Sequence, residues 1–567
     1  MTIDKTYEGK RMQIVIPMSG FGERFRRAGY SVPKPLIEVD GVPIIGHVIN
    51  LFPNETDFTF ICNEDHLASP QYQLRERLVS LCPTGRIVGI PAHKLGPVHA
   101  VRQVEHLLDP ARPVIVNYCD FSCYWDWNAF KNYVSELGCD GAIPAYKGFH
   151  PHSLGTTNYA YLRETFGWVD DIQEKQPFTN NRMEEFASSG TYYFASARLM
   201  SDAFKRTVEG NLSVGGEFYV SLAYKVLLAD KKAVVVYPIQ HFMQWGTPED
   251  LVEYSAWSAT FKRLINPAKY DSPPAGTAVI PMAGLGSRFA KEGYSQSKPL
   301  IPVSGRPMVV QATRDLPFAK QNVFVLRSDM PNYESVIKQI QTEWPNALIK
   351  NINFLTEGQA CTAQIGLDAL LAESGEVLNP LTIGACDNGV IYNHERLSSL
   401  INDDSVGVIV WGIRGYVNAI RHPTMYGWID ADNDVIRRVS VKTALSNPHT
   451  DPIVIGCFTF LRAEDFKRAL DRLIARDGRV NGEFYIDSLI NDAIALGISC
   501  RLFEVDSYLC WGTPNDLRTF EYWQSCFHKW NSHPYRLERD DHVPTDQVCD
   551  LDIKYQATTP TLPERRP

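Results

Sequence analysis

The sequence predicts two successive α/β domains, each built on a mostly parallel sheet with helices on both faces. Two observations support this prediction. A block of sequence recurs about 265 residues further along the chain, and within each copy apolar, strand-like runs alternate with helical patterns. Continuous apolar runs are typical of strands buried on both faces, and such sheets are usually parallel. The 567 residues are enough for two domains of about 250 residues each.

The repeat is visible by direct alignment. Residues 14–45 are identical to residues 278–309 at 18 of 32 positions. Further along, Asp120 pairs with Asp387 at nearly the same offset, 267 residues. A near-constant offset over most of each copy indicates duplication of a whole domain, because solenoid repeats have much shorter periods.

The domain boundaries follow from this repeat. We expect the first domain at residues 11–265 and the second at residues 277–527. Residues 266–276 between them have the Pro, Gly and Ser content of a linker. Residues 528–567 are polar and contain prolines, so we expect this tail to be extended or disordered.

Within the first copy, the elements alternate along the chain. We expect buried strands at residues 12–18, 57–63 and 113–120, and helices at residues 44–52 and 98–108. In sheets of this kind, ligands bind at the carboxyl ends of the strands. The loop after residue 18 and the carboxylate of Asp120 are therefore expected at the same edge of the sheet.

Composition excludes several functional classes. The chain has 56 Lys and Arg against 65 Asp and Glu, and this net charge of −9 argues against a nucleic-acid-binding protein. We find neither an apolar run long enough for a membrane span nor a signal-peptide pattern at the start, so we expect a cytoplasmic protein without membrane association. The 12 cysteines show no zinc-site spacing and are expected to be reduced.

The loop after the first strand is rich in glycine and flanked by basic residues. Gly20 and Gly22 allow the backbone to turn tightly, so that its N–H groups can approach a phosphate. Arg24 follows two residues later and Lys34 ten residues after that. The copy has the same pattern in Gly284, Gly286, Arg288 and Lys298. Charge-assisted donors from several directions suit a triphosphate. The alternative, a glycine turn with solvated cations, is disfavoured because the whole pattern occurs twice.

Two common nucleotide-binding motifs are excluded. The Walker A pattern GxxxxGK[ST] is absent from the loop. The dinucleotide fingerprint GxGxxG also fails, because Phe25 and Phe289 stand where its third glycine would be. Kinase-type and dehydrogenase-type activities therefore lose most of their support.

The runs GFGERFRRAGYSVPKPL and GLGSRFAKEGYSQSKPL resemble the signature of the sugar-phosphate nucleotidylyltransferases. The resemblance covers each repeat almost to its end. It implies the α/β/α sandwich of the nucleotide-diphospho-sugar transferases. It also implies a reaction in which a phosphate oxygen of a phosphorylated acceptor attacks the α-phosphorus of a nucleoside triphosphate and releases pyrophosphate.

The resemblance assigns roles on the triphosphate side. Arg24 would hold the β and γ phosphates, and Lys34 would neutralise charge on the α-phosphate in the transition state. Asp120 matches the family's metal-binding aspartate, and Mg²⁺ commonly takes one or two carboxylates together with phosphate oxygens. The corresponding residues of the second repeat are Arg288, Lys298 and Asp387.

The resemblance also assigns an acceptor side. Glu174 and Lys175 are similar to the family's Glu-Lys-Pro segment, whose lysine contacts the acceptor's phosphate. Gly190, Glu217 and the run WGTPEDL at residues 245–251 would complete this side in the first repeat.

The second repeat departs from the first in two places. It keeps Lys442 and Glu483, but Val441 stands where the first repeat has its glutamate. Its segment EGQACTA resembles the loop that reads the nucleotide's base, and Gln359 can donate to and accept from a base edge. The first repeat has LGPVHAV at residues 95–101 instead, without an amide side chain. The two pockets are thus expected to differ in base choice or in competence.

A second metal ligand is missing in both repeats. Family members often carry another aspartate two residues before the glycine of the GTP motif, but Gln244 and Cys510 occupy that position. In the second repeat Asp506 is a candidate replacement, whereas the first repeat has Gln240 there. The alternative is that Mg²⁺ binds one aspartate and the phosphates alone.

The sequence as a whole predicts a tandem nucleotidylyltransferase that uses Mg²⁺, a nucleoside triphosphate and a phosphorylated sugar or similar small molecule. CTP and GTP are the first candidates for the nucleotide. Its segments resemble the capsule-associated branch of the family, which suggests a role in surface-polysaccharide assembly. Members of the family often form dimers, so a homo-oligomer is compatible with the resemblance. The alternatives are a chain in which one repeat is catalytic and the other regulatory, and a non-catalytic nucleotide-sugar-binding protein.

Overall fold

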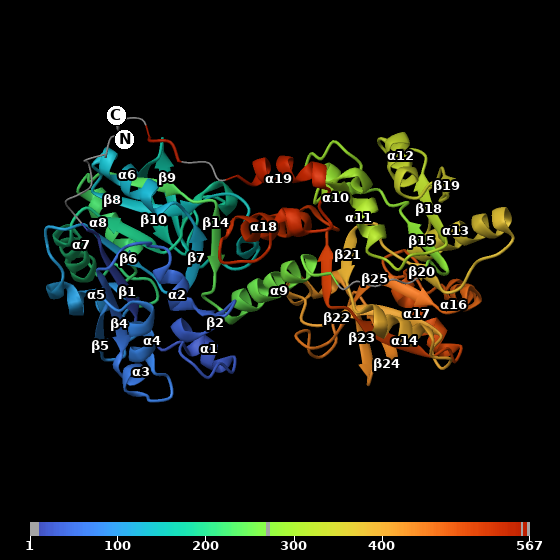
Figure 1. Cartoon of the computed structure of the whole chain (residues 1–567), viewed down its shortest axis with the longest axis horizontal. Helices are drawn as coiled ribbons and strands as arrows, with labels where there is room; N and C mark the ends of the chain where they lie inside the picture. Colours follow the sequence, from blue (N-terminus) through green and yellow to red (C-terminus); the bar gives the residue numbers. More distant parts are fainter. Residues whose placement is uncertain (1–10, 268–272, 557–559, 564–567) are drawn as a thin grey trace. The chain divides into compact units, whose positions relative to one another are not determined.

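The computed structural model describes residues 11–267, 273–556 and 560–563. Part of the predicted linker and of the tail lies outside the described residues. The chain forms two compact units (Figure 1). Of the described residues, unit 1 contains 11–258, 556 and 560–563, and unit 2 contains 259–267 and 273–555. Helix α9 (Pro248–Leu264) begins in unit 1, and its last residues belong to unit 2.

Unit 1 is organised around one large sheet in its described part. In sheet order its strands are β11 (Phe186–Ser188), β9 (Ala160–Thr165), β10 (Trp168–Glu174), β13 (Val234–Pro238), β8 (Gly141–Tyr146), β12 (Thr191–Phe194), β6 (Val114–Asn117), β1 (Gln13–Met18), β4 (Phe58–Asn63) and β5 (Arg86–Ile90). The strands expected at residues 12–18, 57–63 and 113–120 are confirmed as β1, β4 and β6.

The prediction of a mostly parallel sheet needs correction, because the pairing is mixed. Strands β6, β1, β4 and β5 pair in parallel, and so do β8 and β13. Strand β12 enters antiparallel between β6 and β8, and β10, β9 and β11 pair antiparallel with their neighbours. Strands β9 and β10 form a hairpin, whereas β11 and β12 pair antiparallel with strands that are distant in the sequence. The apolar runs of antiparallel strands resemble those of parallel strands, so the sequence did not reveal the pairing.

Helices cover both faces of this sheet. They are α1 (Glu23–Arg27), α2 (Ile44–Ile49), α3 (Glu64–Ala68), α4 (Leu74–Leu81), α5 (Pro97–Val104), α6 (Trp127–Leu137), α7 (Ala197–Glu209) and α8 (Val220–Ala229). On one face α5, α7 and α8 pack on an apolar cluster that includes Val15 and Phe194. On the other face Phe130 of α6 contacts Tyr193 and Tyr237 edge-on. Successive residues of a strand point to opposite faces, so both layers draw on the same strands.

Unit 2 has a sheet of the same plan in its described part. In order its strands are β19 (Leu348–Ile352), β18 (Gln321–Arg327), β15 (Thr277–Pro281), β20 (Leu381–Ile383), β25 (Ile453–Phe460), β22 (Val408–Ile413), β26 (Cys500–Glu504), β24 (Val435–Val441) and β23 (Gly427–Asp432). This order matches β5-β4-β1-β6-β12-β8-β13-β10-β9 of unit 1, strand for strand. The long β25 also pairs with β23, as β11 pairs with β9.

The helices of unit 2 again form two layers. They are α10 (Ser287–Lys291), α11 (Met308–Arg314), α12 (Tyr333–Glu343), α13 (Gln359–Ser374), α14 (His394–Ile401), α15 (Val417–Arg421), α16 (Ala463–Ala475), α17 (Ile486–Ala495), α18 (Pro514–Lys529) and α19 (Val548–Tyr555). One buried cluster joins the sheet to α13, α16 and α17, and a second joins its opposite face to α11, α12 and α14. An α/β architecture is therefore confirmed for both units.

The expectation of an extended or disordered tail is wrong for residues 528–555, which are folded into unit 2. Tyr535 is completely buried, and its hydroxyl donates to Asp540 (2.7 Å) and accepts from Gln524 (2.9 Å). Helix α19 follows with Leu551 and Tyr555 buried. The polar composition misled the prediction because a few well-spaced aromatic residues and hydrogen-bonded carboxylates anchor the segment.

The tail also contains a histidine between two carboxylates, which predicts a pH-dependent stability. Nε2 of His542 lies 2.7 Å from Asp315 and Nδ1 lies 3.2 Å from Asp540. Burial lowers the pKa of the His542 imidazole, but these carboxylates outweigh burial and raise the pKa to about 10. Because the folded-state pKa is raised, the contribution to stability is complete below the unfolded pKa of about 6.5.

We therefore expect the free energy of unfolding of unit 2 to fall as the pH rises from about 6.5 to about 10. Urea unfolding followed at several pH values should show this decline in the wild type and a flatter profile in His542→Gln. An equally steep decline in the variant would contradict the assignment of the effect to His542.

Candidate functional site

The glycine-rich loop leaves β1 and leads directly into α1. Gly22 is the N-cap of α1 with a φ of 61°, a left-handed conformation that favours glycine. Phe25, in the place of the third glycine of a dinucleotide fingerprint, is buried and packs edge-on against Tyr30 at 5.1 Å. In unit 2 Gly286 has a φ of 62°, and the same aromatic pair recurs at 5.0 Å. The aromatic pair thus anchors the short helix behind the loop.

A lysine–aspartate ion pair lies beside this loop in both units. In unit 1 Nζ of Lys34 donates to Oδ2 of Asp120 at 2.9 Å, with side chains 23% and 29% exposed. In unit 2 Nζ of Lys298 donates to Oδ2 of Asp387. Burial lowers the pKa of the Lys34 ammonium, but Asp120 outweighs burial and the pKa is raised. Lys34 therefore stays charged at neutral pH.

Arg24 completes the cationic side of the loop. Its side chain is solvent-exposed, and its positive charge opposes the raised pKa of Lys34. The two cations therefore interact electrostatically. Arg288, the counterpart in unit 2, is exposed as well. Burial lowers the pKa of Lys442, the counterpart of Lys175, and the charge of Arg288 adds to this decrease.

A two-stranded ribbon holds the aspartate in place. β7 (Phe121–Tyr124) starts directly after Asp120 and pairs antiparallel with β14 (His241–Gln244). The N–H of Trp245 donates to the carbonyl of Asp120 at 2.9 Å. A Cβ added to Gly246 would lie 3.2 Å from Oδ2 of Asp120. This glycine therefore keeps the space beside the carboxylate open.

The ribbon of unit 2 repeats these contacts. β21 (Asn388–Ile391) pairs with β27 (Ser507–Cys510), and the N–H of Trp511 donates to the carbonyl of Asp387 at 2.9 Å. A Cβ added to Gly512 would again lie 3.2 Å from Oδ2 of the aspartate. Both units thus give their aspartate the same access.

The register of these ribbons excludes Asp506 as a second metal ligand. Cys510 pairs with Asn388, next to Asp387, whereas Ser507 pairs with Ile391. Asp506 precedes the far end of β27, and four residues of strand place it roughly 13 Å from Cys510. The proposed replacement was therefore wrong.

The structure points to a further hydrogen-bonded carboxylate in each unit, one that the sequence analysis did not single out. In unit 1 Asp250 accepts from Thr247 Oγ1 (2.6 Å) and from Gln244. In unit 2 Asp516 accepts from Thr513 Oγ1 at 2.6 Å and caps α18. The sequence analysis did not single out these two aspartates, because they belong to the runs WGTPEDL and WGTPNDL. A Thr-x-x-Asp pattern of this kind is typical of the start of a helix.

The site suits Mg²⁺ held by one protein carboxylate. Among the described residues no group of three or more His, Cys, Asp or Glu side chains is arranged to hold a metal. Each unit instead offers one partly exposed aspartate with a glycine beside it. A single carboxylate is compatible with Mg²⁺, which keeps waters and takes substrate phosphate oxygens as its other ligands.

The residues predicted for the acceptor side of unit 1 lie around Lys175. This lysine has a φ of 61°, its N–H donates to Tyr159, and its Nζ donates to the Tyr219 hydroxyl at 2.5 Å. Burial raises the pKa of the Tyr219 phenol well above its usual value, Glu217 adds to the increase, and Arg24 opposes it. Arg24 of the glycine loop is therefore within electrostatic reach of the acceptor side.

Two further predicted residues border this cluster. Glu174 at the end of β10 accepts a hydrogen bond from Ser221 Oγ at 2.6 Å. Burial raises the pKa of the Glu174 carboxyl, while Ser221 and Lys175 lower it. Gly190 has a φ of 95°, and a Cβ there would lie 3.1 Å from the Tyr118 ring. Gly190 thus allows close packing and does not itself present a side chain.

The corresponding lysine of unit 2 has the same backbone conformation. Lys442 has a φ of 58°, and its Nζ donates to the carbonyl of Met425 at 2.6 Å. It lies 5.7 Å from the centre of the Tyr485 ring, whose hydroxyl interacts with Glu483. Tyr219 and Tyr485 were not predicted, although both follow two residues after the glutamate of the GEFY runs.

The loops that precede α5 and α13 are built alike. A Cβ on Gly96 would lie 2.7 Å from the Phe218 N atom, and one on Gly358 would lie 2.5 Å from the Phe484 O atom. The first residue of the helix is Pro97 in α5 and Gln359 in α13. The sequence indicated that only the second repeat has an amide side chain here. Pro97 and Gln359, which make this difference, therefore occupy equivalent, partly buried positions.

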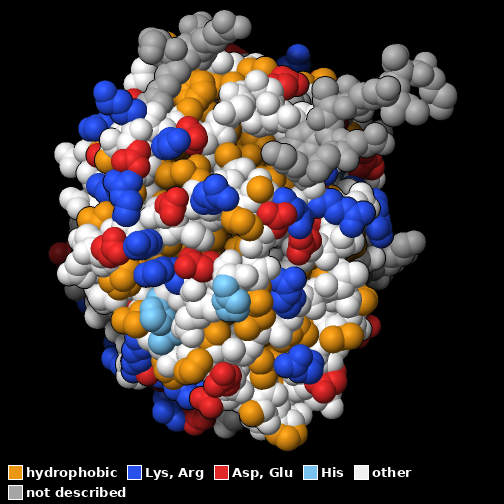
Figure 2. Space-filling model, turned by 90° about the vertical axis from the view of Figure 1, so that its left-hand side faces the viewer, with side chains coloured by type: hydrophobic (Ala, Val, Ile, Leu, Met, Phe, Trp, Pro, Cys, Tyr) orange, Lys and Arg blue, Asp and Glu red, His pale blue; other side chains and the backbone are white. Residues whose placement is uncertain are grey.

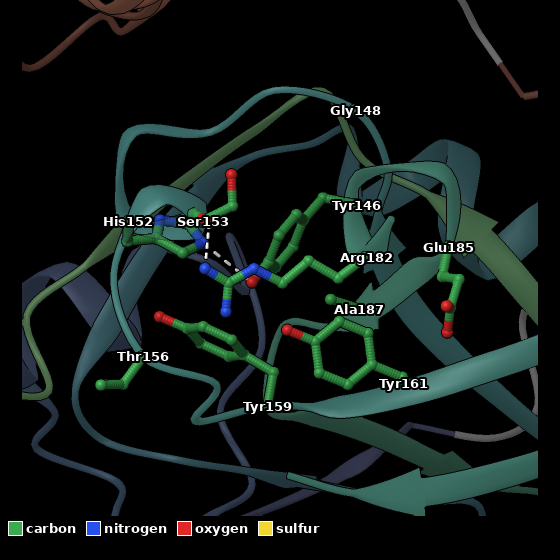
Figure 3. A pocket seen from close by; sticks show the side chains of 10 residues that line it. All are labelled: Tyr146, Gly148, His152, Ser153, Thr156, Tyr159, Tyr161, Arg182, Glu185 and Ala187. Atoms are coloured by element: carbon green, nitrogen blue, oxygen red, sulfur yellow. Dashed lines mark hydrogen bonds between the residues drawn. The ribbon is translucent and has the colours of Figure 1, made fainter. Parts of the chain in front are cut away.

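Unit 1 has a pocket next to its acceptor-side residues (Figure 3). Its wall includes Tyr146, His152, Tyr159, Tyr161 and Arg182. The Tyr159 hydroxyl is buried without a hydrogen-bond partner. Burial raises the pKa of this phenol well above its usual value, and the nearby carboxylates Asp250 and Asp120 add to the effect. An unpartnered hydroxyl near the ion pair is suited to a bound polar ligand.

Arg182 lies across this pocket and donates to the carbonyl of Ser153 (Figure 3). It also donates to the carbonyl of Gly155. At the same offset of 267 residues, unit 2 has Ile413, Ala419 and His449 where unit 1 has Tyr146, His152 and Arg182. Three of the side chains that line this pocket are therefore replaced in unit 2.

Surface charge is mixed. In Figure 2 the Lys and Arg side chains are interspersed with Asp and Glu on the face of the molecule shown. This differs from the continuous basic stripe of nucleic-acid-binding surfaces. None of the helices in the described part of the chain has both the length and the apolar character needed to cross a bilayer.

Comparisons with known proteins give partial matches. No family model matches the chain. Among curated proteins, the chain is 37% identical over 109 residues, 19% of its length, to the bifunctional protein GlmU of Burkholderia multivorans. It is 27% identical over 237 residues, 42% of its length, to that of Paraburkholderia phymatum. The chain covers only 22% and 48% of these two relatives.

Solved structures with weaker similarity include two pyrophosphorylases. The nucleoside-diphosphate-sugar pyrophosphorylase from Vibrio cholerae matches 43% of this chain and 98% of its own, with a TM-score of 0.36 and 21% identity. The UDP-glucose pyrophosphorylase from Acinetobacter baumanii matches 46% of this chain and 99% of its own, with a TM-score of 0.35 and 17% identity.

The tight loop at Gly358 gives a testable prediction about stability. Gly358→Ala should destabilise unit 2 by roughly 2 kcal/mol or more, because its φ of 133° and the approach to the Phe484 backbone both exclude a Cβ. Differential scanning calorimetry should show a Tm lower by several degrees. The matched control is Gly284→Ala, where nothing lies within 4 Å of the added Cβ. Equal Tm values for the two variants would contradict this packing argument.

Proposed function

We propose that the chain is a tandem nucleotidylyltransferase, in which each unit transfers a nucleotidyl group from a nucleoside triphosphate to a phosphorylated small molecule. The observation that carries the proposal is the lysine–aspartate pair beside a left-handed glycine turn, Lys34–Asp120 and Lys298–Asp387. The recurrence of this arrangement in two sheets of equal strand order also supports an origin by duplication.

On the triphosphate side, the geometry supports separate roles for the glycine loop, Arg24 and Lys34. The bare backbone of the glycine loop and the exposed Arg24 guanidinium bind the outer phosphates. Lys34, now paired with Asp120, exchanges this partner for a phosphate oxygen and neutralises the charge that develops at the α-phosphorus. Mg²⁺, held by Asp120 or Asp387 and the phosphates, would supply further charge neutralisation.

On the acceptor side, Lys175 and Lys442 bind the phosphate of the acceptor. Their left-handed backbone turns each ammonium toward a tyrosine, and Arg24 is within electrostatic reach in unit 1. No strong general base is needed, because the acceptor's phosphate is already an anionic nucleophile. The nucleophilic oxygen attacks the α-phosphorus, and pyrophosphate leaves with the electron pair of the broken P–O bond.

The acceptor of unit 1 would reach into the pocket that Tyr159 and Arg182 line. A phosphorylated sugar or polyol fits this chemistry, since aromatic faces and hydroxyl or guanidinium donors suit a polyhydroxylated body. CTP or GTP as the nucleotide and a role in surface-polysaccharide assembly follow only from the resemblance to the capsule-associated branch.

The assay measures pyrophosphate released from each of the four nucleoside triphosphates, with Mg²⁺ and a panel of phosphorylated sugars and polyols. We expect release to require an acceptor and to stop on addition of EDTA. Asp120→Asn and Asp387→Asn should each remove part of the activity, and the double variant should lose roughly 100-fold or more. Each change keeps the size of the side chain and removes only its charge.

The outcomes separate the candidate functions. A silent change in one unit would mean that this unit is regulatory. Absence of pyrophosphate release across the panel, combined with Mg²⁺-independent binding of nucleotide-sugars in calorimetry, would favour the non-catalytic binding protein.

A further inference from the structure

The two units place their acceptor-side carboxylates differently, although their backbones correspond. In unit 1 Glu174 ends β10 and pairs across the strands with Ala160, the first residue of β9. In unit 2 Val441 ends β24 and pairs in the same way with Gly427, the first residue of β23. Glutamate and alanine in unit 1 therefore correspond to valine and glycine in unit 2.

A third position changes together with this pair. Ser221 is the second residue of α8 and donates to Glu174 at 2.6 Å. The second residue of the corresponding helix α17 is Asp487. Replacing serine by aspartate extends the side chain by about one C–O bond, roughly 1.2 Å. It carries a carboxylate oxygen from the helix toward the place where Glu174 has its own.

The glycine explains how the carboxylate is accommodated. A Cβ added to Gly427 would collide with Oδ2 of Asp487. Alanine at the corresponding position of unit 1 is buried without conflict, because the helix presents only a serine there. Each unit therefore holds one carboxylate in this space, from the strand in unit 1 and from the helix in unit 2.

In each unit this carboxylate interacts electrostatically with the neighbouring lysine. Burial lowers the pKa of Lys442, and the Asp487 carboxylate counteracts this effect. Burial raises the pKa of the Asp487 carboxyl to about 6, and Lys442 lowers it. Asp487 thus interacts electrostatically with Lys442, as Glu174 does with Lys175.

We propose that Asp487 is the acceptor-binding carboxylate of unit 2, which takes the place that Glu174 has in unit 1. This inference rests on the proposed function for the acceptor, because it assigns the carboxylate to the same ligand. The chemistry it predicts is a hydroxyl group of a phosphorylated sugar or polyol, donating to Asp487 while the phosphate contacts Lys442. Retention of this carboxylate means that unit 2 keeps an acceptor site despite the loss of the Glu-Lys pair.

The first experiment tests whether the positions share one space, and it needs no turnover. In the full-length protein, Gly427→Ala should lower the Tm by roughly 3 °C or more, because the added Cβ displaces the aspartate. In the Asp487→Ser background the same change should lower the Tm by less than about 1 °C, as the helix then presents the residue of unit 1. An equal effect in both backgrounds would overturn the shared-space inference.

The second experiment tests the role in binding. Unit 1 is silenced by Asp120→Asn, and the KM values of unit 2 are measured with its best nucleoside triphosphate and acceptor. Asp487→Ser should raise the acceptor KM about tenfold and leave the nucleotide KM within about twofold, because a hydrogen bond to a charged group is lost on one substrate only. The triple variant Gly427→Ala/Val441→Glu/Asp487→Ser gives unit 2 the three residues of unit 1. It should restore the acceptor KM to within about threefold of the value before these changes.

An unchanged acceptor KM in Asp487→Ser would overturn the role in acceptor binding. A triple variant that keeps the wild-type Tm but has a raised acceptor KM would also overturn this role. If the silenced protein has no turnover with any substrate pair, the proposed function of unit 2 fails and the binding role falls with it. The Tm experiment then still decides whether the three positions form one exchangeable carboxylate site.

Discussion

The site of each unit depends on one ion pair at the carboxyl edge of its sheet, Lys34–Asp120 in unit 1 and Lys298–Asp387 in unit 2. Two partly buried, opposite charges stabilise each other only while both remain in place. In the proposed function, a phosphate and a divalent cation would offer each charge a new partner, so that the pair could open without leaving either charge unpaired. The resting protein thereby keeps a lysine charged and positioned for an anion.

The surroundings of the ion pair are arranged so that ligands can reach it. Gly22 turns the loop in a left-handed conformation, and Gly246 leaves the side of the aspartate uncovered. The aromatic pair Phe25–Tyr30 fixes the short helix behind the loop. The glycines therefore leave space beside the ion pair, and the aromatic pair holds the short helix behind the loop in place.

The sequence predicted the repeat, the first strands and helices, and the residues of the ion pair, because these depend on local pattern and on motifs that occur twice. It did not predict the mixed pairing, since antiparallel β12 has the same apolar run as a parallel strand. It missed Tyr219, whose hydroxyl accepts from a lysine in a distant segment of the chain. It also missed Asp250, because its Thr-x-x-Asp pattern is typical of a helix start. Asp506 was misplaced because the strand register decides its position. The tail beyond residue 527 was misjudged from average polarity, although a few buried aromatic residues fold it into unit 2.

The central claim is that each ion pair opens to bind a triphosphate, and calorimetric titration with the Mg²⁺ complexes of the four nucleoside triphosphates tests it most directly. The account predicts two binding sites per chain for the preferred nucleotides, of which Lys34→Met removes one and Lys298→Met removes the other. Binding that is unchanged in both variants, or in the double variant, would contradict it.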